Sequence, residues 1–351
     1  MKNILLLAVL LIGNLSVEAQ SQALEQLVDR YVEEYEERYN TFGLAIGIIH
    51  GGYDYHYYYG QLSEDFPFPP NDSTTFAIGG ISKVFTAQIM LECLAEYKIS
   101  PDTSIAYWLP DSLRKGPLSS LSFTDLATHT AGFKKLPNNL PPASGMQKYF
   151  NYDKKLFGQY LRFSAPFNLK KASYHHSHVG YGLLGWMLEN VSQTDYHQLF
   201  QNKISIPLQL ENTSLYHTEN IAIGHSFSGF PTLPQYANSL APALSFVSSL
   251  PDMLSYVNHH LSETTDRLTA STNAMQVSIE KTHQKNVSTS YGWHLIQQKK
   301  QATIFTHSGN TEGYKCFIAF IKDTQTAVVI LSNSEQPVDE MGFELIELIN
   351  R

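Results

Sequence analysis

The sequence predicts an α+β fold in which both ends of the chain build one antiparallel sheet and the middle forms a mainly helical insertion. Strand patterns with short turns occur near both ends of the chain. The middle, about residues 101–260, shows helical patterns and loops punctuated by Pro and Gly, with few strand patterns. We therefore expect the two sets of strands to pair with each other.

The first residues have the pattern of an export signal, which we place at residues 1–19. Lys2 gives a positive start, Ile4–Ile12 is an unbroken apolar run, and Val17 and Ala19 are small residues at the cleavage positions. The run is too short to span a bilayer comfortably. We expect a secreted or periplasmic protein with no membrane span after cleavage.

The N-terminal part of the mature chain predicts a helix, a hairpin and a second helix. Residues Ala23–Tyr39 are charged and amphipathic. Phe42–His50 and Tyr53–Gly60 flank a Gly-Gly turn and are typical of a β-hairpin. Ile81–Tyr97 is apolar on nearly every side, which predicts a helix in the centre of a domain.

The C-terminal part returns to strands, at residues 302–306, 315–321 and 327–331, and ends in a helix over 338–349. A length of 351 residues suits one large domain or two interleaved ones. We divide the chain into a sheet domain and a mainly helical domain with a cleft between them. Their ranges are 20–100 plus 245–351 for the first and 101–244 for the second.

Composition excludes some partners and leaves others open. A net charge of −8 argues against a nucleic-acid partner or an anionic membrane surface. The only cysteines, Cys93 and Cys316, are best explained as two buried free thiols. The sequence does not indicate an oligomeric state.

The start of the buried helix carries the first chemical motif. The segment Phe76–Ala87 resembles the first motif of the class C β-lactamase, D,D-peptidase and esterase branch of the serine β-lactamase and penicillin-binding-protein superfamily. In that motif a serine precedes a lysine by three residues, so both lie on one helix face and the amine can help deprotonate the hydroxyl. Here Lys83 is present, but Gly80 occupies the nucleophile position. Ser82 cannot substitute, because it lies about 100° away around the helix.

The second motif of that branch, Tyr-x-Asn before an apolar helix, is altered. The helix is recognisable in Gly180–Trp186, but His176 stands at the tyrosine position and His178 at the asparagine position. The resemblance implies that the family's tyrosine, which works as base and acid, is replaced by the imidazole of His176.

The third motif, a basic residue or histidine followed by Thr/Ser and Gly on a strand lining the cleft, is intact. His307, Ser308 and Gly309 fit it, and Asn310 would supply the second N–H group of an oxyanion site, beside that of Gly80. Further matches in order along the chain imply a β-lactamase/transpeptidase-like fold. They are residues 126–132, 204–208, 212–214, 252–256 and 328–333.

These departures predict a catalytically impaired homologue, a pseudoenzyme that binds without acylating. Backbone donors survive a serine-to-glycine change, so an anion-binding cleft with Lys83 and His307 nearby can outlast the chemistry. The resemblance implies a small molecule or peptide with a carboxylate as ligand, such as a cell-wall fragment. No cofactor is expected.

Two alternatives remain open. His176 could act as general base on a water molecule in an active hydrolase of esterase, peptidase or β-lactamase type. The cluster His175, His176 and His178 could hold a metal ion, although no carboxylate or cysteine in the motifs completes a ligand set and Lys83 would repel a cation.

Overall fold

The structure is a computed structural model, and it describes most of the chain after the predicted signal. The described residues are 17–39, 42–142, 149–163, 173–216, 219–232, 236–263, 265–297 and 301–350. Residues 1–16 of the predicted signal lie outside them. The first described helix, α2, covers Val17–Arg38, so it begins earlier than the predicted Ala23.

One eight-stranded antiparallel sheet has the order β2-β1-β12-β11-β10-β9-β8-β7. Its strands are β1 Gly43–His50, β2 Tyr53–Gly60, β7 Glu280–Lys281, β8 Val287–Thr289, β9 His294–Ile296, β10 Ile304–Thr311, β11 Tyr314–Ile321 and β12 Thr326–Ser332. The N-terminal hairpin joins the C-terminal strands where β1 pairs with β12, with Leu44 opposite Ser332. The predicted sheet from both ends of the chain is therefore confirmed. The short strands β7 to β9 were not predicted.

The remaining elements lie mostly between β2 and β7, as expected for a helical insertion. The helices are α3 Ser82–Glu96, α4 Asp111–Arg114, α5 Phe123–Ala127, α6 Lys154–Phe163, α7 His178–Ser192, α8 Tyr196–Phe200, α9 Ile206–Leu208, α10 Ala241–Leu244, α11 Leu250–Leu261, α12 Thr269–Ala274 and α13 Asp339–Ile349. Short helical turns are η2 Gly79–Ile81, η3 Ile105–Trp108, η4 Pro117–Ser120, η5 Gln201–Ser205, η6 Asn238–Leu240 and η7 Lys322–Thr324. Two small sheets pair β3 Thr75–Ala77 with β6 Val247–Ser249 and β4 Gly224–His225 with β5 Pro231–Thr232.

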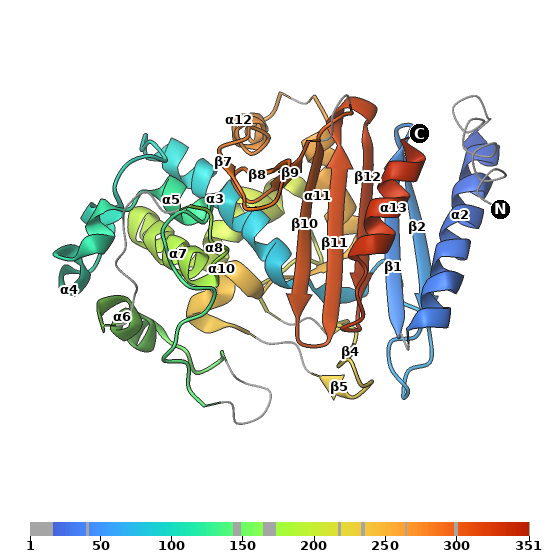
Figure 1. Ribbon diagram of the computed structural model, residues 1–351, viewed down its shortest axis with the longest axis horizontal. Helices are drawn as coiled ribbons and strands as arrows, with labels where there is room; N and C mark the ends of the chain where they lie inside the picture. Colours follow the sequence, from blue (N-terminus) through green and yellow to red (C-terminus); the bar gives the residue numbers. More distant parts are fainter. Residues whose placement is uncertain are drawn as a thin grey trace.

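Helices cover both faces of the sheet (Figure 1). Helices α2 and α13 pack on one face and share a core cluster with inward side chains of the central strands. Helices α11 and α3 and the rest of the helical region lie on the other face, around the larger core cluster. Glycine allows close packing of α13, because a Cβ added to Gly342 would lie 2.2 Å from the Phe317 ring.

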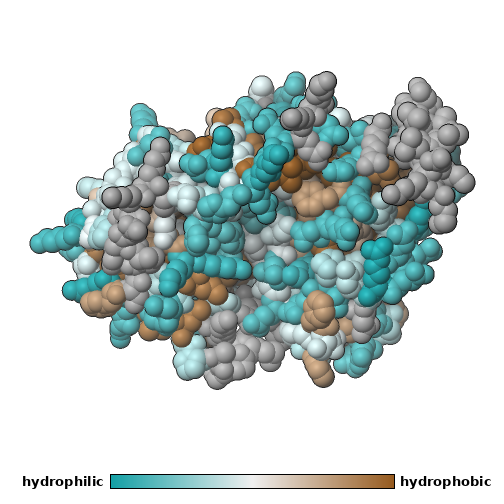
Figure 2. Space-filling model, viewed as in Figure 1, coloured by the Kyte–Doolittle hydropathy of each residue, from teal (hydrophilic) through white to brown (hydrophobic). Residues whose placement is uncertain are grey.

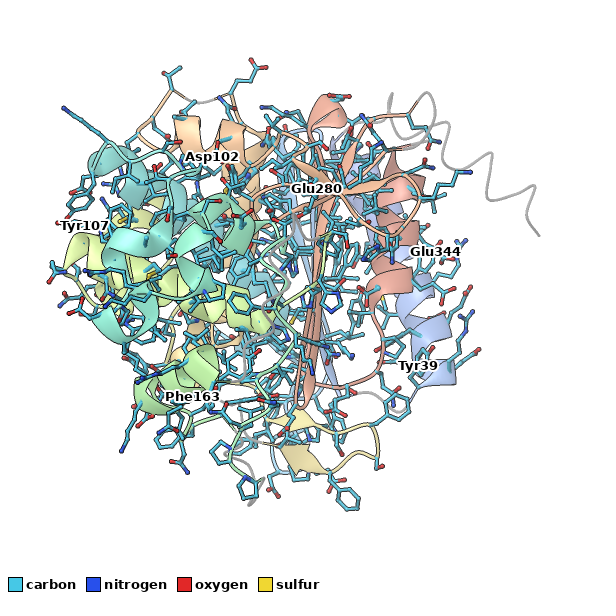
Figure 3. All side chains as sticks on the ribbon, turned by 60° about the vertical axis from the view of Figure 1, so that its left-hand side comes forward. Tyr39, Asp102, Tyr107, Phe163, Glu280 and Glu344 are labelled. Atoms are coloured by element: carbon cyan, nitrogen blue, oxygen red, sulfur yellow. The ribbon has the colours of Figure 1, made fainter. Side chains whose placement is uncertain are left out.

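The face of the molecule shown in Figure 2 is mainly hydrophilic, and the hydrophobic areas on it are small and separate. No helix among the described residues is both long and apolar enough to cross a membrane. Figure 3 shows Tyr107 at the far end of the helical region and Glu344 at the opposite end, on α13. Cys93 and Cys316 are both buried and free, as predicted.

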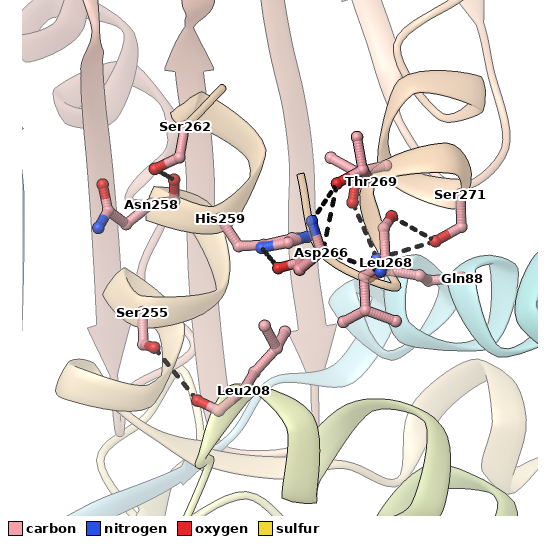
Figure 4. A network of polar contacts seen from close by, with 11 residues as sticks. Gln88, Leu208, Ser255, Asn258, His259, Ser262, Asp266, Leu268, Thr269 and Ser271 are labelled. Carbon is pink, nitrogen blue, oxygen red and sulfur yellow. Dashed lines mark hydrogen bonds and ion pairs between the residues drawn. The ribbon is translucent and has the colours of Figure 1, made fainter. Parts of the chain in front are cut away.

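Helix α3 passes through the centre of the molecule, and its one buried amide is satisfied by neighbouring helices. Gln88 donates from Nε2 to Thr272 Oγ1 of α12 at 3.1 Å and accepts from Tyr256 of α11 at 2.7 Å. Figure 4 shows its further contact with Ser271, beside the polar contacts that join α11 to the start of α12. These bonds offset the desolvation of a polar group in the core and fix the position of α3.

Candidate active site

The first motif lies at the entry to α3, where the chain passes from β3 through η2 into the helix. Ile78 N donates to Phe246 O at 3.0 Å, and Phe246 N donates to Ser82 Oγ at 3.1 Å. These two bonds hold the turn against the segment before β6. The Ser82 hydroxyl is thereby directed at the backbone of residue 246, which agrees with the prediction that it does not replace a nucleophile at position 80.

Lys83 is fully buried, and among the described residues its amine contacts two backbone carbonyls and lies near an aromatic face. Nζ donates to Ala243 O at 3.2 Å and to Gly80 O at 3.4 Å, and it lies 5.9 Å from the centre of the Tyr181 ring. No carboxylate forms an ion pair with it within the described part of the chain. Burial, and secondarily the Lys135 ammonium, lowers the pKa of the Lys83 amine to about 7.

At Gly80, the predicted nucleophile position, an added side chain would force the neighbouring backbone to shift. A Cβ added to Gly80 would lie 2.8 Å from Ser308 O, 3.3 Å from His307 Cε1 and 3.5 Å from Lys83 Nζ. Gly79 has φ +47°, and a Cβ there would lie 2.9 Å from Asn310 N. Strand β10 therefore packs directly on the bare backbone of this glycine turn.

The third motif lies on β10, as predicted, and its residues alternate between the two faces of the sheet. His307 is buried beside Gly80, and its Nδ1 is 2.9 Å from Ser308 O, which makes this nitrogen the donor. Gly309 faces the same turn, with an added Cβ only 2.3 Å from Ile78 O. The exposed Ser308 hydroxyl instead donates to Asp339 of α13, on the other side of the sheet.

The second motif supplies two imidazoles at the start of α7. Ser177 is the N-cap residue, and its Oγ accepts from Gly180 N at 3.1 Å. The rings of His176 and His178 on either side of it have centroids 5.1 Å apart. Nδ1 of His178 is buried and has no hydrogen-bond partner among the described residues.

Two further histidines complete the site and were missed by the sequence analysis. The His129 ring lies 4.8 Å from that of His176, and the His294 ring lies 5.6 Å from that of His307. His294 Nε2 also bonds the Tyr174 hydroxyl at 2.8 Å. His129 lies in the segment 126–132, which was recognised as a family match but not as part of a site. No local pattern marks His294, which reaches the site from the three-residue strand β9. The histidine–lysine site is defined here as Lys83, His129, His176, His178, His294 and His307.

The imidazoles of this site are neutral at neutral pH. In every case burial is the largest cause of the lowered pKa, and the positive charge of Lys83 lowers the pKa further. The pKa of His176 is lowered to about 3 and that of His294 to about 4. Burial holds the pKa of His129, His178 and His307 well below the usual range.

The geometry does not favour the metal alternative. Within the described residues, no group of three or more His, Cys, Asp or Glu side chains is arranged to hold a metal ion. His175, the third member of the predicted set, is exposed, whereas His178 is buried at the helix start.

The comparisons with known proteins identify the family. The sequence profile of the beta-lactamase family matches residues 28–350. The chain belongs to the beta-lactamase family. A beta-lactamase of Providencia stuartii is 23% identical over 88% of this chain and 87% of its own length. A beta-lactamase of Escherichia coli K12 is 22% identical over 84% and 85%.

Solved structures of the family have the same fold. A beta-lactamase/D-alanine carboxypeptidase from Pseudomonas syringae superposes with a TM-score of 0.83 at 21% identity, covering 93% of this chain and 98% of that one. A D-alanine carboxypeptidase from Burkholderia cenocepacia superposes with a TM-score of 0.82 at 20% identity, covering 94% of this chain and 99% of that one. The predicted β-lactamase/transpeptidase-like fold is therefore confirmed. The relatives show the family and the fold, and the roles of individual site residues are inferred from the geometry of this chain.

Proposed function

We propose that this beta-lactamase family member binds a carboxylate-bearing ligand at the histidine–lysine site and forms no acyl-enzyme. The observation that carries the proposal is the glycine turn, where Gly80 lies one helical turn from Lys83 and Ser308 O occupies the space of a side chain. Without a hydroxyl there is nothing to acylate. Deleting the nucleophile of a serine hydrolase typically costs about a million-fold in turnover.

The charge of the site supports an anionic ligand. Lys83 has no carboxylate partner among the described residues, and the exposed Lys135 contributes a positive field to it and to His176. The other groups of the site are imidazoles. In a protein of net charge −8, Lys135 and the protonated form of Lys83 make this region locally positive, which favours an anion. A carboxylate held near His176 would also favour the protonated form of Lys83.

The active-hydrolase alternative receives less support. A general base works best when its pKa lies near the operating pH. Burial first, and then Lys83, lowers the pKa of His176 to about 3, so its imidazole is unprotonated but weakly basic. Water activation by His176 is therefore expected to be slow.

The first test is intact-mass analysis after incubation with a fluorophosphonate and, separately, with a penicillin. We expect no added mass from either reagent. One equivalent of label would show a nucleophile elsewhere in the chain and overturn the non-acylating assignment. The variant His176→Ala tests the alternative in which His176 activates a water molecule. Loss of a measurable hydrolysis rate in this variant would support that mechanism instead.

The second test uses N-acetyl-D-alanyl-D-alanine and its C-terminal amide, which differ only in the carboxylate. We expect the acid to raise the melting temperature and the amide to have no effect. Lys135→Gln should weaken binding of the acid about two- to fivefold, as for loss of one screened charge. Lys134→Gln is the matched control, because Lys134 is also exposed but is not among the charges that shift the pKa values of the site. Equal binding of acid and amide would refute the anion site.

We also propose export of the protein, on the evidence of Lys2 and the apolar run Ile4–Ile12. Mass analysis of the protein recovered from an extracytoplasmic fraction would test this, with a new N-terminus at Gln20 as the expected result.

A further inference from the structure

A pocket opens in the helical region, and it is lined by other residues than those of the histidine–lysine site. Its volume is about 270 Å³, close to the lower end of small-molecule sites, which occupy roughly 300–1,000 Å³. No member of the histidine–lysine site lines it. Its main side chains come from α7, α8, η6 and the loops around them, and they are Trp186, His197, Tyr216, Tyr236, Asn238 and Ser239.

Aromatic rings form much of the wall. The Tyr216 and Tyr236 rings are stacked, with centroids 5.6 Å apart and planes at 27°. The His197 ring lies 4.9 Å from that of Tyr216. Trp186 is only partly buried and contributes a further ring from α7. Tyr216 is 52% exposed, so an aromatic face is offered to solvent at the pocket without supporting the core.

The charged groups of the pocket already have partners within the protein. Lys154 Nζ and Glu189 Oε2 form an ion pair at 2.6 Å. Glu189 Oε1 also accepts from Tyr196 N at 3.3 Å. Asp195 caps the start of α8 by accepting from Gln198 N at 3.0 Å. A charged ligand would have to compete with these bonds, so a neutral one is favoured.

Two polar atoms at the pocket lack partners. Ser239 Oγ and His197 Nδ1 are buried, and neither has a hydrogen-bond partner within the part of the chain that the structure describes. Both residues line the pocket. Buried polar atoms are almost always paired, and an unpaired one costs about 1–3 kcal/mol. A ligand hydroxyl that reached these atoms after a small adjustment of the wall would satisfy them.

We propose that this pocket binds a neutral pyranose sugar. The apolar C–H face of the ring would lie on the tyrosine pair, where aromatic faces present flat area with little loss of entropy. Its hydroxyls would bond Ser239 Oγ and His197 Nδ1. This site is independent of the carboxylate site proposed above, because the two share no residue.

The experiment titrates the full chain with cellobiose, maltose and chitobiose and follows tryptophan fluorescence and heat of binding. We expect saturation by at least one of the three, with a millimolar dissociation constant. Tyr216→Ala combined with Tyr236→Ala should weaken it tenfold or more. Tyr107→Ala is the control, since Tyr107 is 79% exposed and does not line the pocket, and it should leave binding unchanged. Figure 3 shows Tyr107 at the edge of the molecule.

Ser239→Ala separates binding from folding. Its hydroxyl has no hydrogen-bond partner to lose among the residues that the structure describes. The variant should therefore keep or slightly raise the melting temperature while sugar binding weakens about three- to tenfold. Failure of all three sugars to saturate the protein would overturn the proposal. So would saturation by an aromatic probe such as tryptophanol with none by the sugars, or equal weakening by Tyr107→Ala.

Discussion

The buried Lys83 predicts an unusual dependence of stability on pH. Burial lowers the pKa of its amine from 10.5 to about 7 in the folded protein. Between these two values the unfolded chain binds more protons than the folded one, so the free energy of unfolding rises with pH. The gap corresponds to about 5 kcal/mol at 1.36 kcal/mol per pH unit. This cost is fully present below pH 7 and disappears above pH 10.5.

Replacing the lysine with methionine removes this dependence. The cost of burying the amine is about 4 kcal/mol at pH 7 and about 2 kcal/mol at pH 9. Methionine fills a similar volume, but the carbonyls of Gly80 and Ala243 lose their donor, at about 1 kcal/mol each at any pH. The free energy of unfolding of Lys83→Met is therefore expected to exceed that of the wild type by about 2 kcal/mol at pH 7 and to equal it near pH 9.

Urea unfolding of both proteins at pH 7, 8 and 9 measures this difference. The two cysteines and the other titrating groups are common to both proteins, so their contributions largely cancel in the comparison. Lys134→Met, at an exposed position, is the control and should shift stability equally at every pH. A difference between Lys83→Met and wild type that stays constant from pH 7 to pH 9 would refute the assignment of Lys83 as a buried, largely neutral amine.

Three further changes have defined outcomes. The variant Gly80→Ser should still show no labelling by penicillin in an intact-mass assay. It should also lower the free energy of unfolding by about 1–3 kcal/mol, because its Cβ lies 2.8 Å from Ser308 O. An acylated variant would contradict this expectation. Asn333→Ala should cost about 3–5 kcal/mol in urea unfolding, because the buried Gly43 N–H and two partly buried carbonyls, of Leu62 and Ile223, lose their partner. A cost under 1 kcal/mol would show that these bonds are replaced. Cys93 and Cys316 should resist iodoacetamide in the native protein and both react after unfolding, since burial raises their pKa values to about 11 and about 12; rapid native labelling would argue against burial.

Much of the fold followed from the sequence because long periodic segments determine it. The N-terminal hairpin, the buried helix α3 and the strands β10 to β12 were all expected from their patterns, and the structure confirms them. Strands β7 to β9 were not predicted, because a segment of two or three residues is too short to show a hydrophobic alternation. These strands form by pairing with one another and with β10 at the edge of the sheet.

The candidate site was predicted only where a motif marks it. His176, His178 and His307 come from ordered motifs, whereas His129 and His294 meet them through tertiary packing alone. The distance between β10 and the glycine turn could not be predicted either. The residue types predict that a hydroxyl is missing at position 80, whereas the close approach of Ser308 O to this position follows only from the packing.

The glycine turn also constrains how this sequence can change. Strand β10 lies against the bare backbone of Gly79 and Gly80 and is held on either side by β9 and β11. A larger residue at either glycine therefore requires the strand, and the sheet with it, to move. A serine at position 80 would therefore have to be accompanied by changes in β10 that make space for its side chain.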